Sequence, residues 1–470
     1  MFTMNCQILF RQNSLAGEKL NNFFYSDIYP AIIAFITAFC YVGDMPLVAL
    51  ICLATFASIS LIAFRDITPF MPLPMFAVMS LTGFDVFTWP ITYVVLAPVA
   101  LSLVAHFIIY PIKKFKFGSL FLPLTLSTVA LFLGGIFSPF VKTYTNGLVS
   151  ILAIGPLLLF VYVLFTNYFN PPKNFNFRKY VCHVLSLIGI VIAVEIITLN
   201  LIIGGIELGW GNKNAAAAML LICIPATWYL ALYTKRSVSA IVTLEILYLS
   251  ILQIGSAAPI GTAFAFIPII ILSMIFWGKL KTYKFDILKT VIMMLAVLLS
   301  AVLCAVLLSD FLSKLMNFVL INLNDDNSRT ELYNEAINLF KNYPVFGAGL
   351  GYINPNSFLE LSAVITYNFH SFIFHIMATM GSIGIIFFGY YYFSRYRVTM
   401  KANTPFNIMA FFALASFQVY ASVDTGEFNI IPLLISLIIL LVTVEYSNDH
   451  PCEELLPLHI HMAKSPISKF

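Results

Sequence analysis

The feature that most constrains this chain is a long series of apolar runs separated by short polar connections. A helix that crosses a bilayer needs roughly 17–25 mainly apolar residues. Runs that reach or approach this length are 28–42, 47–64, 69–83, 91–110, 118–138, 148–168, 181–203, 215–233, 238–254, 259–277, 287–308, 370–393, 405–422 and 429–445. Because the first and third runs are short, the sequence predicts an all-α, polytopic integral membrane protein with about 12–14 transmembrane helices.

The composition supports this class and excludes a soluble enzyme. Hydrophobic residues make up 60% of the chain and charged residues only 10%, whereas about a quarter of a soluble protein is charged. A polar stretch precedes the first run and no small-residue cleavage site follows it, so we expect a retained first span. Five of the seven cysteines lie in apolar runs, and their spacing predicts neither a disulfide framework nor a metal site. We expect no metal and no cofactor.

Basic residues alternate between the connections, which predicts the direction of the spans. They gather in every second connection as Lys113, Lys114 and Lys116; Lys173, Arg178 and Lys179; Lys235 and Arg236; Lys279, Lys281 and Lys284; and Arg395, Arg397 and Lys401. Extending the alternation to both ends puts the two termini in the cytoplasm. The expected location is therefore a cytoplasmic membrane, which the chain crosses many times.

One connection is much longer than the others and divides the chain. The predicted parts are a cytoplasmic tail (1–27), a transmembrane bundle (28–308), an extracytoplasmic loop (309–369), three last spans (370–446) and a second cytoplasmic tail (447–470). The loop holds six acids and three bases, a net charge of −3. Long loops in compact domains are usually functional, so we searched this loop for a site.

The loop contains a predicted amphipathic helix, Arg329–Asn342. Ser328 and Glu331 have the spacing of a capping box, and Pro344 is expected to stop the helix. Arg329 then lies in the first turn, where free amides and the helix dipole favour an anion such as phosphate. The alternative is a solvated surface arginine, which the pattern alone favours.

Three further features of the sequence each allow a structural and a functional interpretation. Residues 345–351 form a glycine-rich turn that fits either a phosphate cradle or, more simply, a plain loop. His370, where the loop meets the next span, is a candidate general base or a hydrogen-bonded structural group. For His375, inside that span, we expect the structural role. Glu195 and Glu245 lie within spans and are either interhelical hydrogen-bonding groups or proton-coupling carboxylates.

These elements, in this order, resemble the O-antigen ligase and polymerase family of bacterial envelope proteins. The resemblance covers about residues 200–445. It rests on Gly209, Trp210, Gly211, Asn212, Lys213, Asn214, the run Ala215 to Ala218, Pro225, Ser328, Arg329, the loop helix, Tyr343, Pro344, Val345, Phe346, Gly347, Ala348, Gly349, His370, Gly381 and Gly384.

The resemblance implies a reaction and a set of residues. The family transfers a glycan from a polyprenyl diphosphate carrier to a sugar hydroxyl of an acceptor, as a polymerase or as a ligase. Arg329 would then hold the diphosphate, and His370 would orient or deprotonate the acceptor hydroxyl. The family usually has an asparagine where Ser371 follows this histidine, and a second arginine where Ala257 stands.

A second set of residues is predicted to bind sugar beside His370. Trp210 would stack on a sugar ring, Asn212 and Asn214 would hydrogen-bond to hydroxyls, and Lys213 would add positive charge. An interfacial aromatic anchor followed by helix-capping asparagines explains the same residues equally well.

A transporter or flippase of envelope precursors is the alternative from another class. Glu195, Glu245 and the broken run at 69–83 would be its evidence. The long loop with its helix favours the enzyme, because transporter sites lie near the bilayer midplane. A sensor or purely structural membrane protein has no specific support.

Overall fold

The computed structural model describes residues 15–81, 90–139, 143–202, 204, 207–234, 237–256, 258–265, 327–354, 369–424 and 426–450. Its helical elements are α2 (Leu15–Phe24), α3 (Ile28–Val42), α4 (Pro46–Ala63), η1 (Thr68–Phe70), α5 (Pro72–Met79), α6 (Pro90–Ile109), α7 (Phe121–Leu133), α8 (Thr143–Leu152), η3 (Ala153–Leu157), α9 (Leu158–Tyr168), α10 (Phe177–Ile202), α11 (Lys213–Tyr233), α12 (Ser237–Ile254), α16 (Asn327–Asn342), α17 (Phe372–Thr399), α18 (Pro405–Ala421), α19 (Gly426–Asn429) and α20 (Ile431–Asp449). Strands β1 (Glu207–Leu208) and β2 (Gly211–Asn212) pair antiparallel.

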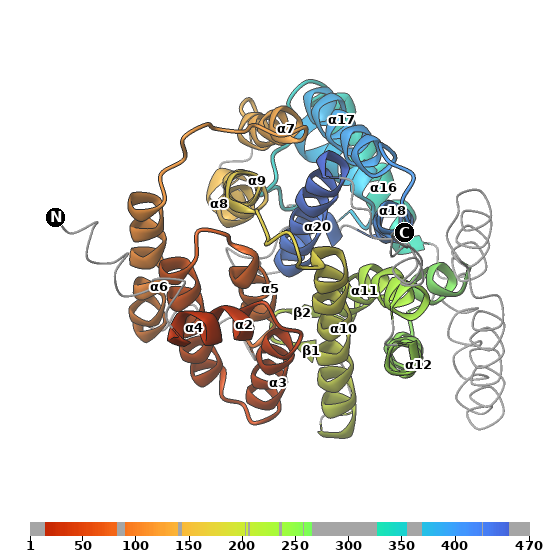
Figure 1. Cartoon of the computed structure of the whole chain (residues 1–470). Helices are drawn as coiled ribbons and strands as arrows, with labels where there is room; N and C mark the ends of the chain where they lie inside the picture. The colour runs from red at the N-terminus through yellow and green to blue at the C-terminus, as the bar shows by residue number, and fades with distance from the viewer. Residues whose placement is uncertain are drawn as a thin grey trace, which may run out of the picture.

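The described helices pack side by side in one bundle, and most of them fall on the predicted apolar runs (Figure 1). Seven are long and apolar enough to cross a membrane, and a bent pair, Gly17–Phe24 with Ile28–Val42, makes an eighth candidate. Four shorter apolar helices, Thr68–Met79, Phe121–Leu133, Val238–Ile254 and Pro405–Ala421, fall on further predicted runs. The prediction of an all-α polytopic membrane protein is therefore confirmed.

The exact number of spans stays a prediction. The predicted run 287–308, and 259–277 beyond residue 265, lie outside the described residues. Among the described residues, the predicted run 148–168 forms one continuous helix that is locally widened. Five of its residues, Ala153–Leu157, form a π-helix around Pro156. Proline lacks the backbone N–H that an α-helix needs, and a π-bulge is a common way to absorb it.

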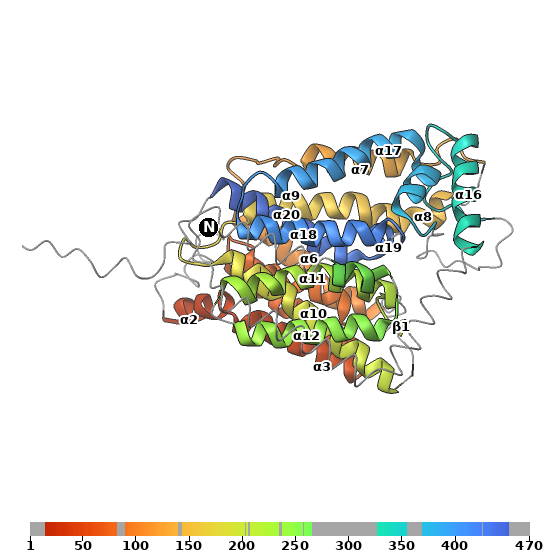
Figure 2. The ribbon, with the colours of Figure 1, turned by 90° about the vertical axis from the view of Figure 1, so that its right-hand side faces the viewer.

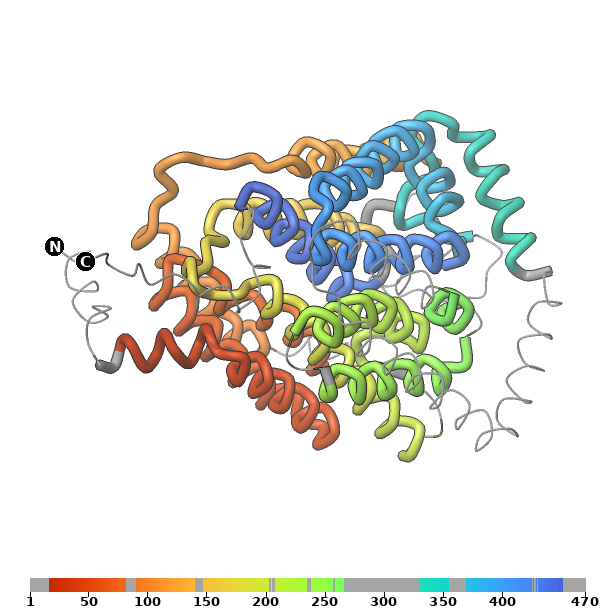
Figure 3. Tube along the Cα trace, turned by 45° about the vertical axis from the view of Figure 1, so that its right-hand side comes forward, coloured from red at the N-terminus to blue at the C-terminus, as the bar shows by residue number. Residues whose placement is uncertain are grey.

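The described basic connections lie at one end of the bundle, whereas Lys235, Arg236, Lys279, Lys281 and Lys284 lie outside the described residues. The backbone N–H of Lys116 donates to Asn167 over 2.8 Å, Lys179 pairs with Asp27 at 2.6 Å, and Lys401 pairs with Asp449 at 3.1 Å. Figure 2 shows α16 lying across the opposite end, which is also the end where β1 and α19 lie. Figure 3 shows the same separation between α2, drawn in red, and α16, drawn in teal. The predicted loop helix and the described basic connections are thus at different ends.

Helix α17 is broken at Gly381, which has the non-helical angles φ 62° and ψ −153°. A break inside a span frees backbone groups that lipid cannot bond. The loop after α16 supplies their partners: Ala348 N donates to Ala378 O (2.8 Å), Gly349 N to Thr379 O (2.9 Å), Ser382 N to Pro344 O (2.8 Å) and Ile383 N to Val345 O (3.3 Å). In an unbroken helix, Ser382 and Ile383 would bond to those same carbonyls of Ala378 and Thr379. The loop therefore replaces the missing partner on each side of the break.

Two glycines allow this close approach. A Cβ at Gly381 would lie 2.6 Å from the carbonyl carbon and oxygen of Val345. A Cβ at Gly347 would collide with the backbone of Thr379, and both glycines have a positive φ. A larger residue at either position would push the loop out of the break.

We predict that Gly381→Ala destabilises the protein, whereas Gly389→Ala does not. The first change forces a methyl group into backbone atoms and a left-handed φ onto alanine, which together cost roughly 2–5 kcal/mol. Gly389 is the matched control, because it lies on the same helix and a Cβ there meets no atom within 4 Å. Thermal unfolding in detergent would measure both variants. Equal midpoints for the two would contradict the packing of the loop into the break.

Candidate active site

The start of α17 is tied to α16 through Tyr333. Its hydroxyl donates to the backbone oxygen of His370 over 3.3 Å, and its ring stacks on Phe374 with centroids 4.4 Å apart. His370 itself is half-buried and has a φ of 49°. A non-glycine residue in this left-handed region is uncommon, and such outliers concentrate at functional sites.

Arg329 lies exposed in the first turn of α16. It precedes Tyr333 by four residues, so the two side chains share one face of the helix. The guanidinium is also near enough to act electrostatically on the hydroxyl of Tyr420 at the end of α18. The predicted helix Arg329–Asn342 is confirmed within α16, which ends two residues before Pro344. The helix begins earlier than predicted, at Asn327, so Ser328 lies inside it and is not the residue that precedes it.

Three polar residues meet near Arg329: Asn214 of α11, Tyr420 of α18, and Asp424 in the segment that follows α18. Asp424 accepts hydrogen bonds from the Asn214 amide at 3.0 Å and from the Tyr420 hydroxyl at 2.8 Å. Tyr420 is buried, with 2% of its surface exposed. The amide oxygen Oδ1 of Asn214 is buried and has no hydrogen-bond partner among the described residues. This cluster therefore offers an unused acceptor beside a positive charge.

Sequence reasoning missed Tyr420 and Asp424. The available signal was position, because Asp424 is the only acid between Arg397 and Gly426 and comes just after an apolar run. An isolated carboxylate at the end of a span is costly unless it has partners. The partner Asn214 is 210 residues away in sequence, so hydropathy could not reveal the pair.

The hairpin residues have structural roles that the sequence allowed as alternatives. Asn212 caps α11, since its side chain accepts from the backbone N–H groups of Asn214 and Ala215. Trp210 is buried, and its indole N–H donates to Glu195 over 2.9 Å. Glu195 is thus a hydrogen-bonding group between segments. Lys213 is the exposed first residue of α11.

The glycine-rich turn is a loop, as the simpler interpretation held. Its successive backbone N–H groups are already paired: Gly347 donates to Tyr343 O, Ala348 to Ala378 O and Gly349 to Thr379 O. These amides are not available to cradle a phosphate. The turn instead fills the break in α17.

His375 differs from the expectation of a hydrogen-bonded group. It is fully buried, and neither ring nitrogen has a partner among the described residues. Its contacts are aromatic, with ring centroids 4.6 Å from Phe428 and 5.9 Å from Phe369. Ser371 precedes α17 and its side chain makes no capping bond. Ala257 lies outside the described residues.

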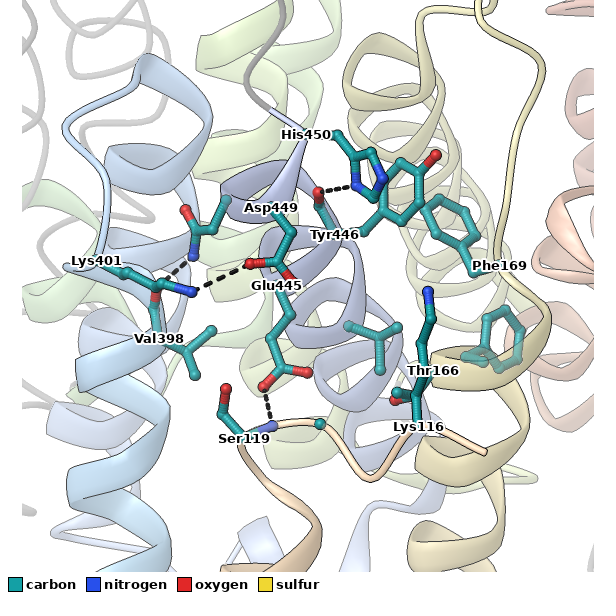
Figure 4. A pocket seen from close by; sticks show the side chains of 14 residues that line it. Lys116, Ser119, Thr166, Phe169, Val398, Lys401, Glu445, Tyr446, Asp449 and His450 are labelled. Atoms are coloured by element: carbon teal, nitrogen blue, oxygen red, sulfur yellow. Dashed lines mark hydrogen bonds and ion pairs between the residues drawn. The ribbon is translucent and has the colours of Figure 1, made fainter. Parts of the chain in front are cut away.

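A separate pocket of about 180 Å³ lies at the other end of the bundle (Figure 4). Among its charged groups, Lys401 pairs with Asp449 at 3.1 Å, and Glu445 accepts from the backbone N–H of Ser119 at 3.0 Å. These contacts join loops at the ends of helices. Both acids that line the pocket are therefore already engaged in structural contacts.

The fold defines a multi-pass, helical membrane protein with a loop helix across one end. Comparison with protein families gives the class: residues 246–389 match the family model of O-antigen ligase. This supports assigning the chain to the O-antigen ligase and polymerase family, and with it a glycan ligase or polymerase role in surface polysaccharide assembly. The match covers less than half of the chain, and it points to lipid-linked glycans in a membrane as the class of substrate.

The matched region includes α16, His370 and the break at Gly381, but neither the β1–β2 hairpin nor Asp424. No curated protein and no solved structure matches the chain.

We predict that Asp424→Ala destabilises the protein by about 1–3 kcal/mol, because it removes the acceptor of the Asn214 amide and the closer acceptor of the Tyr420 hydroxyl. Asp424→Asn keeps one acceptor oxygen and should cost less. The control is Asp449→Ala, which removes an exposed ion pair contributing about 0–1 kcal/mol. Thermal unfolding in detergent would rank the three variants. Equal losses for Asp424→Ala and Asp449→Ala would contradict the cluster.

Proposed function

We propose that the chain transfers a glycan from a polyprenyl diphosphate carrier to a sugar hydroxyl, at a site between Arg329 and His370. The observation that carries the proposal is the contact of Tyr333 with His370. Arg329 lies one helical turn before Tyr333, on the same face of α16. The Tyr333 hydroxyl donates a hydrogen bond of 3.3 Å to the backbone oxygen of His370, so this face of α16 lies against the histidine. An anion-binding group and a base are thereby neighbours.

The two residues have complementary roles in this reaction. Arg329 donates hydrogen bonds to the diphosphate and stabilises the negative charge that grows as it leaves. The first turn of α16 adds free backbone N–H groups and the positive end of the helix dipole. Arg329 and the start of α16 thus bind the diphosphate together, a role for which the resemblance implies two arginines.

The chemical step is a displacement at the anomeric carbon. The acceptor hydroxyl oxygen attacks that carbon, and the bond from the carbon to the diphosphate oxygen breaks. The hydroxyl proton passes to the imidazole of His370, and polyprenyl diphosphate leaves. Attack from the side opposite the leaving group inverts the configuration at the anomeric carbon.

The sugar next to the diphosphate would contact the Asn214, Tyr420 and Asp424 cluster. The unpaired Oδ1 of Asn214 can accept a hydrogen bond from a sugar hydroxyl. Asn212 and Trp210 support the site without contacting the sugar. Asn212 caps the start of α11, and Trp210 holds the hairpin in place through its hydrogen bond to Glu195. Lys213 adds positive charge at the same helix start.

The proposed site also determines which end of the bundle faces out of the cell. A carrier diphosphate with its finished glycan unit is used outside the cytoplasmic membrane, so α16 faces outward and the basic end faces the cytoplasm. The basic-loop rule gives the same direction, and the two ends of the bundle differ accordingly (Figure 2). Both termini are then cytoplasmic.

The transporter alternative has less support. Glu195 accepts a hydrogen bond from Trp210 and is fully buried. The broken run at 69–83 is formed by η1 and α5, which pack against α3 and α4. These two features have a structural explanation without a moving ion, whereas the half-buried Glu245 of α12 remains the evidence for a transporter.

We predict that Arg329→Ala lowers glycan transfer about tenfold or more, because charge-assisted hydrogen bonds are lost. His370→Gly should lower it about a hundredfold or more by removing the base. Glycine accepts the left-handed φ of 49° at this position, so the loss would report on the imidazole and not on the backbone.

The assay would follow carrier-linked donor and transferred glycan in cells lacking the native protein. Lys341→Ala is the control, because this exposed base lies in the last turn of the same helix. Normal transfer by both Arg329→Ala and His370→Gly would refute the site.

We predict opposite labelling of cysteines placed at Lys341 and Lys401 in a background without native cysteines. Both positions are exposed. Lys341 lies in α16, and Lys401 comes just after α17, at the end of the bundle opposite to α16 (Figure 2). A membrane-impermeant thiol reagent should label position 341 in intact cells and position 401 only after the membrane is opened. The reverse pattern would overturn the orientation and the site together.

A further inference from the structure

A groove of about 660 Å³ runs along α16. This volume falls within the range of roughly 300–1,000 Å³ that is typical of small-molecule sites. The lining residues are Glu331, Leu332, Asn334, Glu335, Asn338, Leu339, Asn342, Tyr352 and Asn354. The groove uses neither Arg329 nor His370.

Three asparagines lie in a row along the groove. Asn334, Asn338 and Asn342 recur every four residues, so they lie one above another on one face of α16. All three are exposed, and their amides make no hydrogen bond to another described residue. Each amide can donate and accept at once, as sugar hydroxyls do.

The groove also has an apolar part. Leu332 and Leu339 line it from the side of α16 that packs on α17. The ring of Tyr352 completes this part, and its hydroxyl donates to Glu335 over 2.8 Å, which fixes the ring. A pyranose ring has an apolar C–H face and a polar edge, and this groove offers a surface for each.

The charge of the groove selects among sugars. Glu331 and Glu335 are the charged residues among its described lining residues, and no base accompanies them there. Carboxylates accept hydrogen bonds from hydroxyl and ammonium groups but repel other carboxylates. Uronic acids and other acidic sugars are therefore disfavoured.

We propose that this groove is a glycan-binding subsite for neutral sugars or amino sugars. It rests on the proposed function in one respect: the glycan that it holds belongs to the substrate. From Glu331 to Asn342 the helix rises about 16 Å at roughly 1.5 Å per residue. A sugar chain attached to a diphosphate at Arg329 can therefore lie along α16, with successive sugars at successive turns of the helix.

The test is binding of free oligosaccharides to the whole protein in lipid nanodiscs, which avoid sugar-headed detergents. The probes are an array of bacterial polysaccharide fragments in three groups: neutral or N-acetylated sugars, sugars with free amines, and uronic acids. We expect binding to members of the first two groups. Replacing Asn334, Asn338 and Asn342 together with alanine should weaken this binding about tenfold or more, since several hydrogen bonds are lost.

Two further variants sharpen the test. Lys341→Ala, on the same helix but outside the groove, should bind as the wild type does. Glu331→Lys should increase binding of the uronic acid group. If the triple variant unfolds at a lower temperature than the wild type, the single variant Asn338→Ala takes its place.

Three results would each overturn the subsite. They are no binding of any fragment by the wild type, unchanged binding by the asparagine variants, or preferred binding of uronic acids by the wild type. Free fragments carry no diphosphate, so Arg329→Ala should leave array binding intact. A failed array with transfer still dependent on Arg329 would therefore refute the subsite alone, and the opposite result would refute the transfer site alone.

Discussion

The structure depends on the pairing of backbone groups at the break in α17. A helix interrupted at membrane depth leaves N–H and C=O groups that must be bonded within the protein. Here the loop after α16 bonds both sides of the break, through Ala348 and Gly349 on one side and Pro344 and Val345 on the other. If the loop moved out of the break, these backbone groups would lose their hydrogen-bond partners. The free-energy cost of unpaired polar backbone groups in lipid therefore fixes the position of the loop.

This pairing sets the geometry of the candidate site. Helix α16 leads directly into the loop, and its apolar face packs on the first part of α17 around Ala336, Leu339 and Ala378. With α16 held at its end and along its face, Tyr333 meets His370, and Arg329 comes one turn away. The site is therefore built on a rigid pair of helices, although its residues lie in what the sequence presents as a long loop.

Local patterns in the sequence predicted the elements, and long-range contacts decided what they do. Hydropathy located α3 at Ile28–Val42, and helix signals with Pro344 located α16, because both depend on neighbours along the chain. The role of the glycine-rich turn depends on carbonyls about thirty residues away, and the same glycine spacing also fits a phosphate cradle. Asp424, Tyr420 and the Trp210–Glu195 bond were likewise hidden, because each joins segments that hydropathy treats separately.

The central claim is that the diphosphate of a carrier-linked glycan binds at Arg329 beside His370. A cryo-electron microscopy structure of the protein in nanodiscs, with such a donor bound, tests it most directly. The account predicts phosphate density against the guanidinium of Arg329, the first sugar next to His370, and the loop still seated in the break of α17. Phosphate density at the opposite end of the bundle, near Lys116 and Lys401, would contradict it.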